Sequence, residues 1–446
     1  MELKRNATLA WIAGAIILIG MFAKSFLFRE GEPVILHYAL TSFCVALTAI
    51  YAVLSTRRLV VDPVVASLLI FAIIWAFFSA MASGIGLNLV AVVTFAVLAV
   101  GYGIFLPNLL FWSGKEGWEV ISLLLSVGAV FSALFFLLAP DLAIDPDSGR
   151  LAGVYVSVAV SCTMLGFAAV LALRQSLVSK TAWVAIFWFS IFFASAVMVY
   201  LTKTRSSFAE MAVAIFLIMQ FSPSSRGLKM IISSLSAIAA LAMLASILTI
   251  STGIASIDEQ LTEFRLDDGS IIDSRNNNWS FGFERLAAKP LFGEGLLAKQ
   301  TQGGTSGIDF DSKSSYNVSY DPHSLILSLG VQGGYPFLIA MCALMLWIPY
   351  RFVRVFGVSA ALQSPEFILV SLRLLISIVA GGDMTALGNL VDKLCWLFLG
   401  LMAIKSELKV RQSQAVTGSR RSFLAKPYVR MTEVNVLDCV DKRLYP

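Results

Sequence analysis

Apolar stretches of about 20 residues recur along almost the whole chain, and this feature restricts its fold more than any other. A helix needs about 20 mainly apolar residues to cross the hydrocarbon core of a bilayer. Of the 446 residues, 58% are hydrophobic and only 14% are charged, and the mean hydropathy is +0.82. A soluble core could not bury so much apolar surface. The sequence therefore predicts an all-α, polytopic membrane protein.

We expect about twelve transmembrane helices with one large external loop. The first span is too long for a removable signal peptide. The eighth and eleventh are short enough to be re-entrant or broken. The approximate limits of the twelve spans are 7–28, 33–54, 64–82, 87–106, 117–139, 151–173, 181–201, 208–221, 229–250, 323–349, 366–380 and 384–404.

The polar segments divide the chain into four parts. Residues 1–250 hold the first nine spans, 251–322 form the external loop domain, 323–404 hold the last three spans, and 405–446 form a cytoplasmic tail. Within the loop, Trp279, Phe283 and Leu286 have the spacing of one helical face. Residues 302–319 are rich in Gly, Ser and Asn, which predicts a mobile flap.

The charge argues against a nucleic-acid-binding protein, and the cysteine content argues against a protein held together by disulfides or a metal. The 33 Lys and Arg residues against 28 Asp and Glu residues give a net charge of +5, which is too small and too scattered for nucleic-acid binding. The five cysteines form neither a disulfide framework nor a metal-binding pair. No metal or cofactor is expected.

Basic residues predict the orientation, because they accumulate on the cytoplasmic side of membrane proteins. They recur at every second connection, which places both termini in the cytoplasm and the 140–149 connection outside. Lys203 and Arg205 break this pattern, because the same count places them outside. The basic residues that follow the rule are Lys4, Arg5, Arg57, Arg58, Arg174, Lys180, Arg226, Lys229, Arg351, Arg354 and those of the tail.

The eighth span offers a reason for these external cations. Ser207 and Glu210 have the spacing of a capping box, which predicts that the span begins at Phe208. Residues 208–221 would then extend about 21 Å, against a hydrocarbon core of about 30 Å. Lys203 and Arg205 would be recessed, and recessed cations need a counter-anion such as a lipid pyrophosphate. The alternative is an ordinary snorkelling pair at a helix end.

His323 is the candidate base. The order Asp321-Pro322-His323 predicts a helix start, with Asp321 as N-cap and Pro322 at the first helical position. The helix dipole disfavours an imidazolium at this place, so a neutral ring could accept a proton. The alternative is an interfacial histidine that only packs.

Further charges lie in the loop and in the last spans. Arg275 and Arg285 add cations to the loop, and Gly293 and Gly295 are typical of a tight turn more than of a phosphate site. Charges within a membrane are functional or paired with one another. The sequence assigns no partner to those of the last two spans, which are Arg373, Asp383, Asp392 and Lys393.

Three blocks of residues resemble the O-antigen ligase and polymerase superfamily of bacterial envelope glycosyltransferases. The first is Thr204-Arg205-Ser206-Ser207 at the start of a span. The second combines Arg275 and Trp279 with the segment Lys289-Pro-Leu-Phe-Gly-Glu-Gly295. The third begins at His323 and continues to the pair Gly330 and Gly333. All three lie in order on the predicted outer face.

The resemblance implies a multi-pass protein of the bacterial inner membrane with its active site on the periplasmic side. Such proteins move a glycan from an undecaprenyl-pyrophosphate carrier to a sugar hydroxyl, without nucleotide sugar, ATP or essential metal. The acceptor is a growing glycan in polymerases, of O-antigen or exopolysaccharide, and the lipid A core in ligases. The resemblance also implies other envelope polysaccharide assembly proteins as partners, in addition to the lipid bilayer.

Together, the residues and the resemblance predict a mechanism. Arg205 and Arg275 bind the pyrophosphate, Lys203 assists them, and His323 accepts the proton of the attacking hydroxyl. Direct displacement inverts the anomeric centre. Substrate-binding roles are also predicted for Arg285, Trp279 and Asp321.

Two other classes of protein are compatible with the same spans. A flippase of the same lipid-linked oligosaccharide would also place charges in a cavity, but transporters commonly have two similar halves, and no matching halves are evident. A structural scaffold is the third alternative. Between polymerase and ligase, the sequence favours polymerase only slightly.

Overall fold

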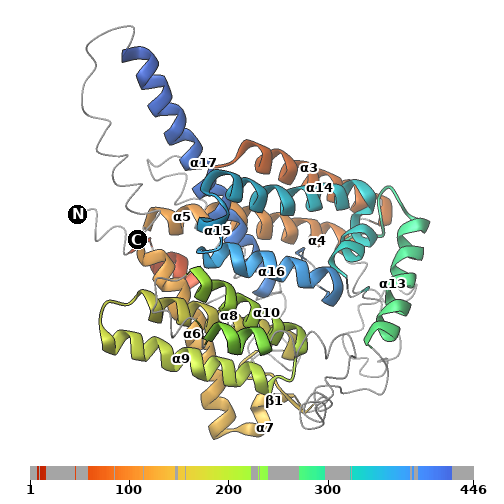
Figure 1. Ribbon diagram of the computed structural model, residues 1–446. Helices are drawn as coiled ribbons and strands as arrows, with labels where there is room; N and C mark the ends of the chain where they lie inside the picture. The colour runs from red at the N-terminus through yellow and green to blue at the C-terminus, as the bar shows by residue number, and fades with distance from the viewer. Residues whose placement is uncertain are drawn as a thin grey trace.

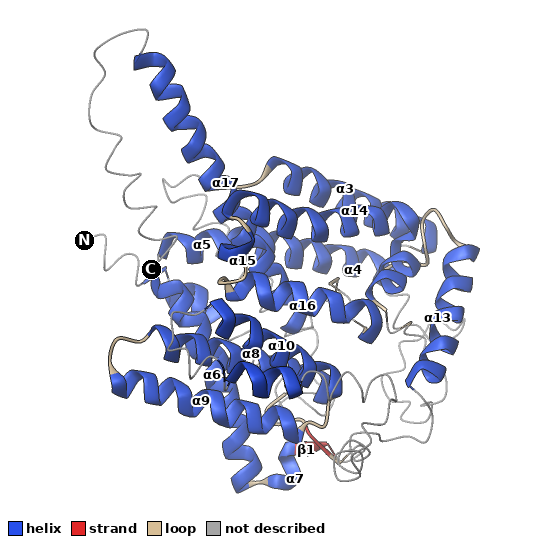
Figure 2. Cartoon of the chain, viewed as in Figure 1, coloured by secondary structure: helices blue, strands red, loops and turns tan. Residues whose placement is uncertain are grey.

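Helices form nearly all of the described part of the chain (Figure 2). The computed structural model describes residues 8–9, 11–16, 46, 59–84, 86–113, 115–145, 149–155, 157–221, 230, 232–239, 271–296, 322, 324–381, 384–385 and 390–423. The helices are α3 (Pro63–Ser83), α4 (Gly86–Ala96), the π-helical η2 (Val97–Phe105), α5 (Leu106–Ser113), α6 (Lys115–Leu138), α7 (Pro140–Ala143), α8 (Val158–Val178), α9 (Ala182–Leu201), α10 (Arg205–Phe221), α13 (Ile271–Ala288), α14 (Leu325–Phe356), α15 (Val358–Ala361), α16 (Pro365–Ala380) and α17 (Leu390–Phe423).

Six helical stretches in the described residues are long and apolar enough to cross a membrane. They correspond to predicted spans three to seven and ten, which confirms a membrane protein built of helices. The predicted total of twelve stays a prediction, because spans one, two and nine lie largely outside the described residues. The six stretches are Pro63–Ser83, Asn88–Trp112, Val120–Leu138, Val158–Val178, Ala182–Leu201 and Leu325–Phe356.

The eighth and eleventh spans are short, as predicted. Helix α10 has 17 residues and α16 has 16. At 1.5 Å per residue they extend about 26 and 24 Å, less than the hydrocarbon core of about 30 Å.

One predicted boundary of a span was wrong. The sixth span begins at Val158 and not at 151, because Arg150–Leu151 form strand β2, which pairs antiparallel with β1 (Ile144–Asp145). Among the described residues, this small hairpin is the exception to the all-α prediction. The predicted border between the last span and the tail at 405 falls inside α17, which continues to Phe423 and projects beyond the other helices in Figure 1.

The helices pack in two groups that meet at α16 (Figure 1). Helices α3, α5, α14, α17 and η2 form one group, and α6, α8, α9 and α10 form the other. Helix α16 contacts α14 and α17 on one side and α8 and α10 on the other. The backbones of η2 and α17 approach each other closely at Gly103 and Gly400, where a Cβ on Gly400 would overlap with the Gly103 carbonyl. Small residues allow such close helix packing in membranes.

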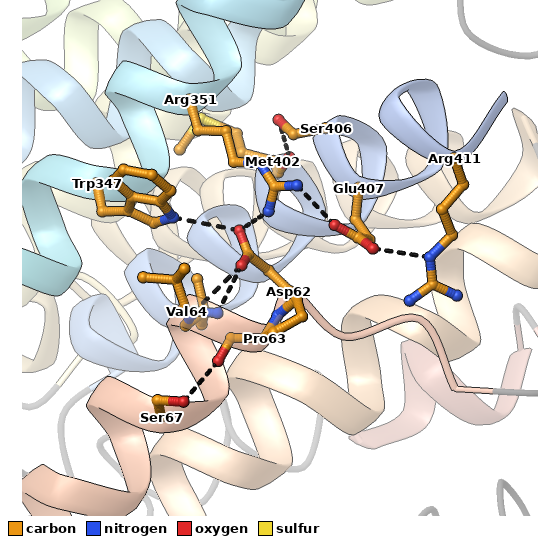
Figure 3. A network of polar contacts seen from close by, with 11 residues as sticks. Asp62, Pro63, Val64, Ser67, Trp347, Arg351, Met402, Ser406, Glu407 and Arg411 are labelled. Atoms are coloured by element: carbon orange, nitrogen blue, oxygen red, sulfur yellow. Dashed lines mark hydrogen bonds and ion pairs between the residues drawn. The ribbon is translucent and has the colours of Figure 1, made fainter. Parts of the chain in front are cut away.

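A buried ion-pair network joins three helices at one end of the bundle (Figure 3). Arg351 of α14 donates to Asp62, the N-cap of α3, and to Oε2 of Glu407 of α17 at 2.6 Å. The sequence assigns the segments around all three residues to the cytoplasmic side. At the other end, the hairpin contacts the turn between α9 and α10, and both were assigned to the outside. The contacts thus group the connections as the predicted topology requires, while the orientation itself stays a prediction.

Candidate functional site

The turn between α9 and α10 carries two of the predicted site residues. Helix α9 ends at Leu201, Thr202 is its buried C-cap, and Lys203 adopts a left-handed conformation with φ 50°. Helix α10 begins at Arg205. Both cations are half-buried. A side-chain-bearing residue in this backbone region costs about 1 to 3 kcal/mol and persists only where surrounding contacts hold it.

The predicted capping box was wrong. Ser207 lies inside α10 and is buried, with its Oγ 2.9 Å from Sγ of Cys162 on α8. Glu210 does not reach back to the helix start. Its Oε2 lies 3.8 Å from Nη1 of Arg373 on α16, and the space beside it has no room for a water molecule. The attraction of a buried cation outweighed the local capping rule, because a buried carboxylate needs a counter-charge.

Arg150 of the hairpin binds the same turn. Its Nε donates to the Thr202 carbonyl at 2.8 Å, and its Nη2 donates to the Lys203 carbonyl at 3.0 Å and to Oγ1 of Thr204 at 2.6 Å. Burial lowers the pKa of the Arg150 guanidinium, and the neighbouring Cys162 and Asp145 act in the opposite direction. Arginine keeps its charge despite such a shift, because the guanidinium is not deprotonated in proteins.

A second part of the site is the turn that follows α13, residues 290–296, which is hydrogen-bonded to a break in α14. The N–H of Glu294 donates to the Val331 carbonyl at 2.8 Å, and the N–H of Gly295 donates to the Gln332 carbonyl at 3.0 Å. In return, the N–H of Tyr335 donates to the Pro290 carbonyl at 2.8 Å. The turn therefore substitutes for hydrogen bonds that α14 lacks at this point.

The break in α14 has an identifiable cause. Gly334 has φ 72°, outside the helical region, and the next residue but one is Pro336, which has no N–H to offer the Gln332 carbonyl. Freed backbone groups at membrane depth need internal partners. Two glycines allow the close approach, because a Cβ on Gly293 would lie 2.6 Å from the Val331 carbonyl oxygen and one on Gly334 would overlap with Leu291.

Helix α3 completes this joint. Trp75 donates from Nε1 to the carbonyls of Leu291 at 3.2 Å and Gly333 at 3.1 Å, and its ring stacks on Phe292 with centroids 5.4 Å apart. The hydroxyl of Ser79 donates to the Gln332 carbonyl at 2.9 Å. The glycine-containing segment is therefore a structural joint between α3, α13 and α14, which agrees with the prediction of a tight turn at Gly293 and Gly295.

The described start of α14 differs from the predicted one. The helix begins at Leu325 with Ser324 as its N-cap, so the predicted N-cap role of Asp321 was wrong. Asp321 and His323 themselves lie outside the described residues. Pro322, between them, lies against α13, because a Cβ on Gly282 would be 3.0 Å from the Pro322 Cβ. The middle of α13 thus lies beside Pro322.

Helix α13 confirms the helical spacing predicted around Trp279. Leu286 is buried against Gly330 of α14, while Phe283 is 61% exposed. The indole N–H of Trp279 is buried and has no acceptor in the described part of the chain. Arg285 pairs with Glu294 at 2.5 Å and lies over the Phe281 ring. Arg275 is in the first half of the helix, and its side chain is outside the described residues.

The structure brings together two of the three sequence blocks. Residues 290–295 of the second block are hydrogen-bonded to residues 331–335, which include the end of the third block. The first block, with Arg205, lies on α10, which packs on α8, α9 and α16. Because α14 also packs on α16, that helix connects the two parts of the site.

The sequence did not predict three residues whose contacts hold the two parts of the site. Arg150 was noted only as a base at the end of an external connection, Arg373 had no assigned partner, and Trp75 was part of an apolar span. Arg373 alone gave a signal, because a cation within a membrane span predicts a buried acid. The contacts of Arg150 and Trp75 depend on backbone carbonyls that no sequence pattern identifies.

Fold and site together define a polytopic helical membrane protein. Residues 189–342 match the family model for the O-antigen ligase. The matched residues extend from α9 into α14 and contain all three blocks. The resemblance to the O-antigen ligase and polymerase superfamily is thereby confirmed over this part of the chain, and it implies a membrane enzyme of the glycosyltransferase type. A search of curated proteins finds no match to this chain.

Proposed function

We propose that this protein transfers a glycan from undecaprenyl pyrophosphate to a sugar hydroxyl on the periplasmic face of the bacterial inner membrane. It acts as a polysaccharide polymerase or an O-antigen ligase, and we favour the polymerase. One observation carries the proposal. The family match covers the Arg205 turn, α13, the turn that follows it and the first part of α14. Backbone hydrogen bonds join the turn after α13 to residues 331–335 of α14.

The proposed reaction is a single displacement. The acceptor hydroxyl oxygen attacks the anomeric carbon, the bond from that carbon to the phosphate oxygen breaks, and undecaprenyl pyrophosphate leaves with the electron pair. The hydroxyl proton passes to His323. Inversion of the anomeric centre follows, because attack and departure occur on opposite faces. No metal or cofactor takes part in this proposal.

Positive charge at the leaving group is the main contribution that the chain makes. Arg205 and Arg275 neutralise the diphosphate as its charge develops, and Lys203 adds a half-buried cation beside Arg205. Charge-assisted hydrogen bonds from arginine suit phosphate oxygens, because the guanidinium presents several donors in one plane.

Trp279 and Arg285 were both predicted to bind substrate, and their contacts support this role to different degrees. The Trp279 indole N–H, buried with no acceptor in the described residues, suits a donor or acceptor sugar oxygen. Arg285 already pairs with Glu294, so we assign it to holding α13 on its own turn, with substrate contact as a secondary role. Asp321 is proposed to bind substrate next to His323.

Complementation of a deletion strain tests the proposal. Arg205→Ala, Arg275→Ala and His323→Ala are compared with Arg354→Ala, which changes an exposed arginine in the last turn of α14. At equal membrane abundance, we expect the first three to lose polymer by at least about a hundredfold and Arg354→Ala to keep it. Full polymer from all three site variants would refute the assignment.

Lipid analysis of the same strain separates the classes. Single repeat units that remain on the carrier indicate a polymerase. A ladder on the carrier that is missing from the lipid A core indicates a ligase. Repeat units that never reach the outer face would indicate the flippase instead.

A further inference from the structure

Arg150 connects the external hairpin to the turn before Arg205. It is half-buried, it lies in β2, and its partner in the strand pair is Asp145. Two nitrogens of its guanidinium donate to three acceptors in consecutive residues, Thr202 to Thr204, at 2.6 to 3.0 Å. A single side chain thus binds every residue between the end of α9 and the start of α10.

This turn needs such a contact for two reasons. Lys203 holds a left-handed backbone conformation with φ 50°, which residues other than glycine and asparagine rarely adopt at a helix C-terminus. The carbonyls of Thr202 and Lys203 also follow the last residue of α9, so no later N–H of that helix can pair with them. A cation at the C-terminus of a helix satisfies such carbonyls and interacts favourably with the helix dipole.

The position of Arg205 depends on the same turn. Arg205 is the first residue of α10 and directly follows Thr204, whose Oγ1 accepts from Arg150 and donates to the Thr202 carbonyl at 3.2 Å. If the turn relaxed from its left-handed form, the first residue of α10 would change direction relative to α9. The geometry of the turn therefore determines the position of Arg205 relative to α9.

We propose that Arg150 is a positioning residue that holds the Thr202–Thr204 turn so that Arg205 meets the pyrophosphate of the lipid-linked donor. This inference rests on the proposed function of Arg205. Arg150 itself does not bind the diphosphate, because its Nε and Nη2 are directed at protein acceptors. A lysine cannot replace it fully, because one ammonium group lacks the planar set of donors that reaches three acceptors at once.

The test compares Arg150→Gln and Arg150→Lys with Arg354→Gln in full-length protein reconstituted in lipid nanodiscs. Two quantities are measured, which are hydrogen exchange of the amides in residues 199–208 and the affinity for undecaprenyl pyrophosphate. In Arg150→Gln we expect exchange to rise in this segment alone and affinity to fall about tenfold or more, the scale of one lost charge-assisted hydrogen bond. Arg150→Lys should show a smaller change in both, and Arg354→Gln none.

A double variant then tests whether Arg150 affects lipid binding through Arg205. In an Arg205→Gln background, Arg150→Gln should cause no further loss of affinity, because two residues that act through one contact are not additive. If Arg150→Gln does not accumulate in membranes, Arg150→Lys in the same background carries this comparison.

Three results would overturn the inference. Unchanged exchange in Arg150→Gln would mean that the turn does not need Arg150. Weaker binding without increased exchange, or an additive loss with Arg205→Gln, would mean that Arg150 contacts the lipid directly. Failure of the proposed function looks different, since wild type and Arg205→Gln would then bind the lipid equally weakly while exchange still rises in Arg150→Gln. That result also removes the role assigned to the turn.

Discussion

The Nη1 atom of Arg373 lies 3.8 Å from Oε2 of Glu210, in the contact between α16 and α10. Neither carboxylate oxygen of Glu210 has a hydrogen-bond partner in the described residues, and both side chains are largely buried. The pair joins the helix that starts with Arg205 to the helix on which α14 packs. Each charge therefore depends on the other, because a buried charge that loses its partner is left uncompensated.

Replacing Arg373 alone should destabilise the protein strongly. Arg373→Met leaves the buried Glu210 without a counter-charge, which costs about 3 to 5 kcal/mol of folding free energy. The double change Glu210→Leu with Arg373→Met removes both charges and should recover most of that loss. Thermal unfolding of purified protein in one detergent measures this, with Arg354→Met as the control. Equal midpoints for Arg373→Met and Arg354→Met would contradict the role of the pair.

Alanine substitutions at two glycines with similar backbone angles distinguish the effect of backbone strain from the effect of close packing. Gly334 has φ 72° and is in contact with the 290–296 turn, whereas Gly357 has φ 84° and has nothing within 4 Å of a Cβ. Alanine at either position costs about 1 to 3 kcal/mol of backbone strain, because both residues have a positive φ with an extended ψ that essentially only glycine adopts. Only Gly334→Ala should also release the turn from α14. We expect glycan transfer to fall more than about tenfold in Gly334→Ala.

Hydrogen exchange checks the cause of that loss. Amides of Glu294, Gly295 and Tyr335 should lose protection in Gly334→Ala and keep it in Gly357→Ala, because these N–H groups make the bonds between turn and helix. If both variants lose the same protection and the same activity, strain alone explains the effect.

We expect the ion-pair network of Arg351, Asp62 and Glu407, at the other end of the bundle, to affect the stability of the protein and not its activity. Arg351 is 16% exposed and contacts two buried carboxylates, so Arg351→Gln should cost about 3 to 5 kcal/mol. Arg411 contacts the same Glu407 from a position that is 51% exposed, so Arg411→Gln should cost less than about 1 kcal/mol. Unfolding midpoints of the two variants, compared at equal salt, give the difference. Similar midpoints would show that burial does not distinguish the two pairs.

Trp75→Phe keeps an aromatic ring against Phe292 and removes the two hydrogen bonds from Nε1. The carbonyls of Leu291 and Gly333 would each lose a donor, which costs about 1 to 3 kcal/mol. Trp183→Phe is the control, because Trp183 is 79% exposed. Thermal unfolding and glycan transfer should both decline in Trp75→Phe and stay constant in Trp183→Phe. A neutral Trp75→Phe would show that stacking alone holds the joint.

Hydropathy and spacing predicted much of the helical framework. Predicted spans three, five and seven agree closely with α3, α6 and α9, because the length of an apolar stretch is a local property that the bilayer thickness demands. The periodicity around Trp279 likewise predicted α13. The short eighth and eleventh spans were also predicted from length alone.

Local rules failed where a distant partner competed with them. Ser207 and Glu210 match a capping box, yet Glu210 faces Arg373, which is far away in the chain. The N-cap of α14 is Ser324 and not the predicted Asp321, and Pro322 lies against Gly282 of α13. The sixth span began late because its first residues pair as a strand.

The sequence by itself determined that this chain is a bundle of membrane helices and which stretches carry the family motifs. Only the tertiary structure decided which polar groups meet, as with Arg150 and the Thr202 carbonyl or Trp75 and the Leu291 carbonyl. The physical reason is that the first property is local to one segment, whereas the second depends on contacts between segments that are distant in the sequence. Transfer of an apolar helix into lipid depends on that segment alone, whereas hydrogen bonds and ion pairs require two segments to arrive within about 3 to 4 Å of each other.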